Sequence, residues 1–267
     1  MKDETDVPVG YLSQRNGLSS FFEDAIAIIE TAKSKGVEMR LMGATAIYYR
    51  CPGSQRLNQS MNRALTDLDF VTLSKYVSHI PDLFSNLGYD GNERVNTMYG
   101  LSRQIYIARQ GGRHVDVFLD KLSFSHVIDL TSRLEIDPVT LTLADLLLEK
   151  MQIAKINEKD LKDTIILLRE HELGDKDGDA VNVKYVAKLL SDDWGFYYTV
   201  TENLKTTKDY ADKLDLLSPA DKTLVRRKID VLPDRIEKQG KSIKWRMRAK
   251  AGTRMPWYNE TENVENR

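Results

Sequence analysis

Two aspartates separated by a single leucine, Asp67 and Asp69, limit how this chain can fold more than any other feature. They lie in a strand-like run, residues 66–73, in which they alternate with Leu68 and Phe70. Because successive side chains of a strand point to opposite faces, both carboxylates share one face, about 6 to 7 Å apart along the chain. Two like charges held this close raise each other's pKa, so a fold that keeps them together needs a cation or a basic side chain beside them.

A third carboxylate, Asp116, lies in another strand-like run, residues 114–119. Residues 103–109 form the run before it, and the glycine pair between the two runs predicts a hairpin. Asp116 can then point the same way as the aspartate pair, with His114 on its face as a structural or supporting residue. For the pair alone, the alternative of a polar strand face in water is the simpler interpretation.

A glycine between a strand and a helix is the second feature that points to chemistry. The strand expected at residues 37–42 ends at Gly43, and residues 44–50 read as a helix. Such a glycine lets the backbone approach a phosphate while the amides of the helix end point outward, although an ordinary tight turn also explains it. Hard divalent cations prefer carboxylate oxygens and bind beside substrate phosphates. Three carboxylates can hold such cations against a nucleoside triphosphate, which indicates nucleotidyl transfer.

The rest of the chain adds mostly helices, together with one segment expected to be irregular. Residues 51–63, rich in Pro, Gly, Ser, Asn and Gln, predict an exposed and mobile loop. A boundary is expected near residues 174–179, which gives a first domain over 1–174, a helical domain over 175–251 and a loose tail over 252–267. Apolar spacing predicts helices over residues 20–36, 75–87, 142–168 in two stripes, 183–190, 198–214 and 220–245.

Composition excludes several classes of protein. Hydrophobic residues make up 41% and charged residues 30% of the 267, which is typical of a globular chain and not of a disordered or membrane-spanning one. No apolar run is long enough to cross a bilayer, and the N-terminus lacks the apolar segment of a secretory signal, so we expect a cytoplasmic protein with no membrane partner. The single cysteine, Cys51, cannot form an internal disulfide.

Charge is distributed unevenly along the chain. Residues 226–254 contain eleven Lys or Arg against three Asp or Glu. This segment could attract an anionic partner such as RNA. Since Trp245 is the only aromatic residue within it, a solvated helix face is the simpler interpretation.

Residues 41–118 resemble the nucleotidyltransferase superfamily, whose fold is polymerase beta-like. The run Leu-Met-Gly-Ala-Thr-Ala at residues 41–46 is similar to the Gly-Gly-Thr-Ala form of the AbiEii-like, abortive-infection branch. The run Thr-Asp-Leu-Asp-Phe at residues 66–70 is similar to its metal-binding strand, and residues 143–168 resemble the helical segment that follows its core. The resemblance implies an α+β fold, with a mixed sheet flanked by helices and followed by a mainly helical C-terminal domain.

The resemblance also implies a set of site residues. Asp67, Asp69 and Asp116 would bind Mg²⁺ or Mn²⁺, and Asp116 would help to activate the acceptor hydroxyl. The phosphates of the nucleotide would contact three consecutive residues, Gly43, Ala44 and Thr45.

Three features depart from the family pattern. Ala44 stands where Gly or Ser is expected, residues 51–63 lengthen the interval before the aspartate pair, and Arg63 and Thr66 are spaced one residue differently. Backbone contacts to phosphate can survive the alanine, and the inserted segment would cover the site or contact the acceptor.

Lys150 takes the place of a lysine in the helical segment of the family, and would pair with the triphosphate or the acceptor as a catalytic and nucleotide-binding residue. Lys159, Asp160 and Asp163 match the family's Lys-Asp-x-x-Asp pattern, and either aspartate would orient Lys150. The alternatives carry equal weight: Lys150 faces solvent, and the other three residues form an exposed helix start whose acidic groups favour the helix dipole.

The function implied is transfer of a nucleoside monophosphate from ATP or another nucleoside triphosphate to an acceptor hydroxyl on RNA, protein or a small molecule. The AbiEii-like branch adds a role as the toxin of a toxin–antitoxin or phage-defence pair, with an antitoxin protein as partner. The alternative is a catalytically degenerate scaffold that uses the C-terminal helices to bind a partner.

Overall fold

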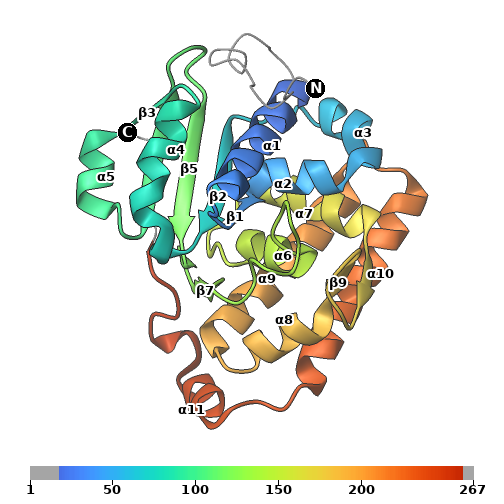
Figure 1. The fold of residues 1–267 in the computed structure, drawn as a ribbon. Helices are drawn as coiled ribbons and strands as arrows, with labels where there is room; N and C mark the ends of the chain where they lie inside the picture. The colour runs from blue at the N-terminus through green and yellow to red at the C-terminus, as the bar shows by residue number, and fades with distance from the viewer. Residues whose placement is uncertain (1–17, 261–267) are drawn as a thin grey trace. The chain divides into compact units, whose positions relative to one another are not determined.

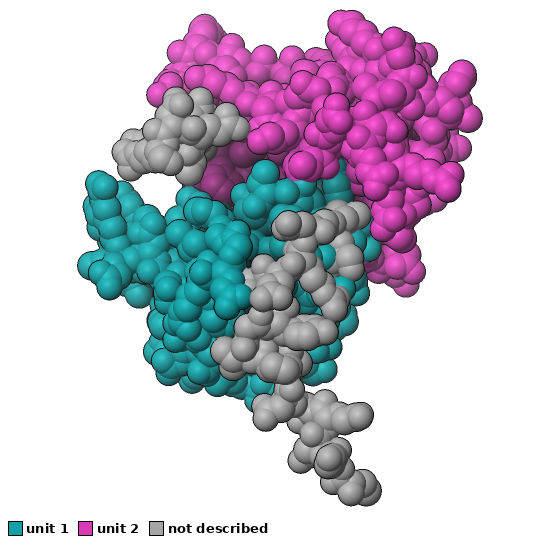
Figure 2. Space-filling view, turned by 90° about the horizontal axis from the view of Figure 1, so that it is seen from above, with its two compact units in different colours: residues 1–49, 65–121, 129–141 teal, residues 50–64, 122–128, 142–267 magenta. Residues whose placement is uncertain are grey.

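The computed structural model describes residues 18–260, and these fold as two compact units (Figure 1, Figure 2). The described part of the first unit consists of residues 18–49, 65–121 and 129–141, and that of the second of residues 50–64, 122–128 and 142–260. A mixed sheet with helices in the first unit and a helical C-terminal region in the second confirm the expected α+β class. The domain boundaries near residues 174 and 251 stay a prediction.

The five-stranded sheet of the first unit has the strand order β1-β2-β5-β4-β3. β2 and β5 run parallel at its centre, and the other neighbours are antiparallel. Leu68 and Phe70 are fully buried, whereas Asp67 and Asp69 are not, so the alternation expected in this strand is confirmed. The strands are β1 (Met39–Met42), β2 (Asp67–Thr72), β3 (Tyr89–Gly91), β4 (Arg103–Ala108) and β5 (His114–Leu119).

The hairpin expected around the glycine pair joins β4 to β5. Gly111 and Gly112 have φ angles of 75° and 64°, in the left-handed region that glycine adopts without steric cost. The amide of Ala108 donates to the carbonyl oxygen of Arg113 at 2.9 Å and closes the turn. The two glycines therefore place Asp116 on a strand that returns into the sheet.

Helices of the first unit follow the expected pattern with two exceptions. The expected helix over residues 75–87 is divided between η2 and α4, and an additional helix, α5, exposes most of its side chains and buries none of them. Because α5 has no buried face, its sequence shows no apolar periodicity. The helix start is marked only by Asn92, whose side chain accepts a hydrogen bond from the Val95 amide. The helices are α1 (Leu18–Ser34), α2 (Gly43–Arg50), η2 (Ser74–His79), α4 (Ile80–Asn86) and α5 (Glu93–Tyr99).

The second unit consists mainly of helices, with short strand pairs between them. The described residues 18–260 contain no helix that is both long enough and apolar enough to cross a bilayer. The helices are η1 (Pro52–Ser54), α3 (Gln55–Ser60), α6 (Leu143–Met151), α7 (Glu158–Glu170), α8 (Val183–Leu190), α9 (Trp194–Lys213), α10 (Pro219–Lys238), α11 (Ile243–Ala251) and η3 (Gly252–Arg254), and the short strands are β6 (Lys121–Ser123), β7 (Val127–Asp129), β8 (Glu172–Gly174) and β9 (Ala180–Asn182).

The prediction of a loop over residues 51–63 is wrong, although seven of its 13 residues are exposed as expected, and its mobility stays a prediction. This segment contains η1 and α3, with Cys51 and Ser54 fully buried and Asn58 3% exposed. The amide of Gly53 donates to the Glu170 carboxylate at 3.1 Å, which ties the segment to α7. Its residue types are frequent in turns, but packing against the helical unit overrides that local preference.

The prediction of one helix over residues 220–245 is also wrong, since α10 and α11 are separate. Gln239 leaves the helical conformation at the end of α10, and the Ser242 side chain accepts from the Trp245 amide to begin α11. After α11 the chain stays packed: the Trp257 ring lies 5.3 Å from that of Tyr198. Of the expected tail, residues 261–267 lie outside the described part.

A buried histidine makes the stability of the second unit depend on pH. His126 is 4% exposed, stacks on Phe196 and shares a 2.8 Å hydrogen bond with the Thr199 hydroxyl. Burial lowers the pKa of His126 from 6.5 to about 4. As the pH falls, this residue therefore takes up a proton at a higher pH in the unfolded chain than in the folded protein. Stability is therefore lost as pH falls below 6.5, and we expect a loss of about 2 kcal/mol between pH 7 and 4.5 from this group.

Denaturant unfolding at several pH values measures this effect. His126→Gln should flatten the dependence between pH 7 and 4.5 relative to the wild type. His79→Gln, which alters an exposed histidine, should leave the slope unchanged. If stability depended on pH as steeply in His126→Gln as in the wild type, His126 would not be the cause of the pH dependence.

Candidate functional site

The three aspartates singled out in the sequence meet on one face of the sheet. Asp67 and Asp69 project from β2, and Asp116 projects from the parallel neighbour β5. Asp69 and Asp116 are direct register partners, so their side chains leave the sheet on the same side. One carboxylate oxygen from each aspartate lies within 4.8 Å of those of the other two. The structure thus brings together carboxylates that are far apart in the sequence.

Gly43 lies directly against this group. Its neighbour Met42 pairs with Asp69 across β1 and β2, so the chain turns into α2 beside the Asp69 carboxylate. Gly43 has a φ of +71°, and a Cβ atom built on it would lie 2.3 Å from Oδ2 of Asp69. No other residue can occupy this position without displacing the carboxylate. The neighbour that approaches Gly43 in the structure is a carboxylate, and the expected approach of a phosphate stays a prediction.

Replacing Gly43 with alanine should therefore displace Asp69. The substitution adds left-handed strain of about 1 kcal/mol and forces the carboxylate away from its two partners. We expect the affinity for Mn²⁺ to fall by at least about tenfold, as when groups that orient metal ligands are lost. Isothermal titration with Mn²⁺ measures the change.

Gly36→Ala is a matched control, because Gly36 has a φ of +70° and a Cβ atom added to it would meet nothing within 4 Å. It should cost similar stability and leave Mn²⁺ binding as in the wild type. Equal Mn²⁺ affinities in both variants would show that Gly43 does not position Asp69.

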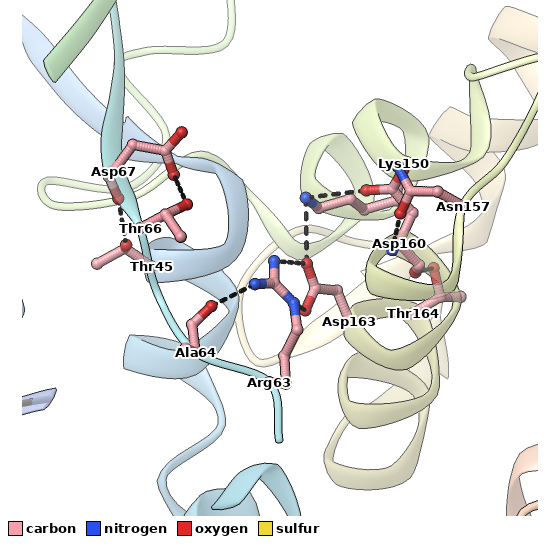
Figure 3. Close-up of polar contacts among 10 residues, drawn as sticks. All are labelled: Thr45, Arg63, Ala64, Thr66, Asp67, Lys150, Asn157, Asp160, Asp163 and Thr164. Atoms are coloured by element: carbon pink, nitrogen blue, oxygen red, sulfur yellow. Dashed lines mark hydrogen bonds and ion pairs between the residues drawn. The ribbon is translucent and has the colours of Figure 1, made fainter. Parts of the chain in front are cut away.

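Two threonines hold the start of β2 in place (Figure 3). The Thr45 hydroxyl donates to the backbone carbonyl oxygen of Asp67 at 3.2 Å, and the Thr66 hydroxyl donates to the Asp67 carboxylate at 2.9 Å. Thr45 is 1% exposed, so its side chain joins α2 to β2. Ala44 before it is partly exposed. Contacts of both residues with phosphate stay a prediction.

Arg103 is a residue of this site that the sequence did not single out. Its Nε and Nη2 atoms both lie 2.8 Å from Oδ1 of Asp116. Burial raises the pKa of Asp116 above its ordinary value, while Arg103 acts in the opposite direction. Arg103 belongs to β4, two residues before Ile105, the register partner of Asp116, and strand alternation places both on one face. The pairing of Arg103 with Asp116 can therefore be predicted only when the register of β4 and β5 is known.

The donors of the group fit a hard divalent cation. All three side chains offer carboxylate oxygen, the ligand that Mg²⁺ and Mn²⁺ prefer. Three like charges this close repel one another, and a divalent cation between them would relieve that repulsion. Within residues 18–260, this is the one group of three or more His, Cys, Asp or Glu side chains close enough to share an ion.

A second polar cluster lies in the other unit and contains the expected Lys150 (Figure 3). The Lys150 ammonium lies 3.4 Å from Oδ1 of Asp160 and 3.2 Å from Oδ2 of Asp163. Arg63 donates to both oxygens of Asp163 at 2.9 Å, in a bidentate pair. The Asp163 side chain is fully buried, and those of Arg63, Lys150 and Asp160 are 8%, 13% and 13% exposed.

This cluster decides between the two interpretations of the Lys-Asp-x-x-Asp pattern. The Lys150 side chain does not face solvent and the two aspartates are not exposed, so those parts of the alternative are wrong. Asp160 does lie in the first turn of α7, beside an exposed Lys159, as that alternative expected. Burial raises the pKa of Asp160, and Lys150 acts in the opposite direction. The aspartates do orient Lys150, but its contact with a nucleotide or an acceptor stays a prediction.

Comparisons with known proteins add one weak likeness. No protein-family model matches the chain, and no curated protein matches it in sequence. A solution structure of the antibiotic-resistance factor ANT(2'')-Ia is similar over 57% of this chain and 84% of that one, at 12% identity and a TM-score of 0.39. A likeness at this level carries no argument about activity, and the case for function rests on the geometry of the site.

Proposed function

We propose that this protein is a divalent-metal-dependent nucleotidyltransferase, which moves a nucleoside monophosphate from a nucleoside triphosphate to an acceptor hydroxyl. The observation that supports this most strongly is the group of Asp67, Asp69 and Asp116, whose oxygens approach within 4.8 Å beside the glycine that begins α2. Its acidic donors suit a cation bound to a triphosphate better than they suit a bare phosphate, which they would repel. The resemblance of residues 41–118 to the superfamily points to the same chemistry.

In the proposed reaction the acceptor oxygen attacks the α-phosphorus and forms a new phosphorus–oxygen bond. The bond between that phosphorus and the oxygen bridging to the β-phosphate breaks, and pyrophosphate leaves with the electron pair. Asp67 and Asp69 would hold Mg²⁺ or Mn²⁺, which when bound neutralises phosphate charge and orients the reacting groups. Asp116 would complete this ligand set and accept the proton of the acceptor hydroxyl, while Arg103 keeps its carboxylate in place.

Phosphate binding would come from the start of α2. Amides of the first helical turn lack partners within the helix and favour an anion, and Gly43 adds no side chain to block it. Thr45 would act through Asp67, whose carbonyl oxygen its hydroxyl contacts. Lys150 is proposed to meet the triphosphate or the acceptor.

Transfer of label from α-³²P nucleoside triphosphates tests the proposal. The four common triphosphates are incubated with Mg²⁺ or Mn²⁺ and, in separate reactions, RNA, cell protein or hydroxyl-bearing small molecules. We expect metal-dependent labelling of one acceptor class together with release of pyrophosphate. If no acceptor is labelled and no triphosphate binds in the presence of metal, the protein is a scaffold on this fold.

The resemblance to the AbiEii-like branch supports a further part of the proposal, that transfer acts as a toxin restrained by a partner protein. Induced expression in a bacterial host should then slow growth, and Asp69→Asn should restore it. Equal growth of cells expressing the wild type and the variant would remove the toxin role without affecting the transferase proposal.

A further inference from the structure

The basic segment over residues 226–254 divides into two parts with different surroundings. In α10, four of the cations lie in ion pairs with three carboxylates. Arg227 and Lys228 lie 3.5 and 2.9 Å from the Glu172 carboxylate, and Arg226 lies 2.6 Å from that of Asp212. Arg235 pairs with Asp175. This half of the segment is a set of ion pairs and offers little charge to a partner.

The half that contains α11 has no such compensation. Residues 239–259 include six Lys or Arg and no Asp or Glu. Arg248 and Arg254 donate to backbone carbonyl oxygens near the end of α11. Lys244, Arg246 and Lys250 are exposed and form no ion pair with any residue that the structure describes. An uncompensated positive surface thus remains on this helix.

One face of α11 anchors it to the unit. The Trp245 ring contacts that of Tyr197 at 5.3 Å, and the Arg248 guanidinium lies over the Trp194 ring at 5.0 Å. The Ser242 amide donates to the Ser191 carbonyl oxygen at 3.0 Å. These contacts determine which side of the helix, labelled in Figure 1, faces outward.

The outward face of α11 is apolar at its centre. Ile243 is 71% exposed and Met247 is 67% exposed, and their spacing of four residues places them one above the other. At 100° per residue, Arg246 and Lys250 lie on one side of this pair and Lys244 on the other. Ile243 and Met247 thus form an apolar seam between cations. In coiled coils, a helix with such a seam pairs with a helix whose own apolar seam is flanked by acidic residues.

We propose that α11 is a docking surface for an acidic amphipathic helix of a partner protein. The apolar residues of that helix would cover Ile243 and Met247, and its Glu or Asp side chains would meet Lys244, Arg246 and Lys250. A nucleic acid fits less well, because single strands bind through exposed aromatic rings, and Trp245 already contacts Tyr197. The inference does not depend on nucleotidyl transfer.

Fluorescence anisotropy with the full chain tests this surface. The first probe is a labelled helical peptide with leucine at the seam positions and glutamate at the flanking ones, and the second is a scrambled peptide of the same composition. The third is a labelled single-stranded RNA of 20 nucleotides. We expect the patterned peptide to bind at least about tenfold more tightly than the scrambled one, because only the former places its apolar groups on Ile243 and Met247.

Two double variants separate the parts of the interaction. Ile243→Ser with Met247→Ser, and Lys244→Glu with Lys250→Glu, should each weaken binding of the patterned peptide by at least about tenfold. The control reverses two exposed lysines of α8, Lys184→Glu with Lys188→Glu, and should bind like the wild type. Equal binding of the two peptides, an unaffected Ile243 and Met247 variant, or tighter binding of RNA through Lys244 and Lys250 would overturn the proposal.

Discussion

Asp69→Asn should reduce metal-dependent nucleotidyl transfer by about a thousandfold while the protein stays folded. Asparagine keeps the shape of the side chain, so it still fits beside Gly43, but it removes the negative charge between Asp67 and Asp116. A neutral amide oxygen is a much weaker ligand for a divalent cation than a carboxylate. Initial rates of transfer from an α-³²P nucleoside triphosphate measure the loss, and thermal unfolding shows that the fold remains.

Asp82→Asn supplies the matched control in the same unit. Asp82 is an exposed residue of α4, and the same change of charge there should leave the transfer rate within about twofold of the wild type, as for most surface substitutions. If Asp69→Asn kept more than a tenth of the wild-type rate with equal stability, Asp69 would not hold the catalytic metal.

The largest effect on stability is expected at Asp163. Its fully buried carboxylate receives the Arg63 guanidinium in two hydrogen bonds and lies 3.2 Å from the Lys150 ammonium. Asp163→Asn would leave two cations in a buried site with only Asp160 between them. Since breaking a buried ion pair from one side leaves an uncompensated charge, the free energy of unfolding should fall by about 3 to 5 kcal/mol.

Asp230→Asn tests whether burial is the cause. Asp230 pairs with Lys208 at 2.6 Å, but its side chain is 54% exposed, so its loss should cost less than about 1 kcal/mol. Urea unfolding of both variants and the wild type gives the comparison. Similar small losses in the two variants would mean that the Asp163 cluster contributes no more than a surface ion pair.

Strand alternation made the centre of the sheet predictable from the sequence. Leu68 and Phe70 are fully buried while the aspartates that alternate with them are not, and a period of two leaves no other arrangement once one face is covered. The same reasoning placed Asp116 toward the pair, and the glycine pair at 111–112 set the hairpin that carries it. Local rules therefore determined the part of the site that lies on β2 and β5.

Tertiary contacts determined what the sequence did not reveal. Residues 51–63 have the composition of a loop, yet they contain η1 and α3. Cys51 and Ser54 are buried, and the Ser54 hydroxyl accepts a hydrogen bond from Arg169 of α7. The break between α10 and α11 has local causes instead: Gly240 follows the C-cap Gln239, and Ser242 caps the start of α11.

The arginines that pair with the aspartates of both clusters could not be predicted from the sequence. Arg103 contacts Asp116 through the register of β4 and β5, and Arg63 contacts Asp163 across 100 residues of sequence. Neither spacing forms a pattern along the chain, so only the folded structure reveals these partners. In both clusters the aspartates were assigned roles from the sequence, whereas Arg63 was noted without a role and Arg103 was not singled out.

Binding of Mn²⁺, measured by the loss of the free-ion signal in electron paramagnetic resonance, tests the central claim most directly. In the presence of a non-hydrolysable ATP analogue, the wild type should bind Mn²⁺ at least about tenfold more tightly than Asp67→Asn, Asp69→Asn or Asp116→Asn, with Asp82→Asn unchanged. Mn²⁺ affinities in the three site variants equal to that of the wild type would contradict the account, because the meeting point of β2 and β5 would then hold no metal.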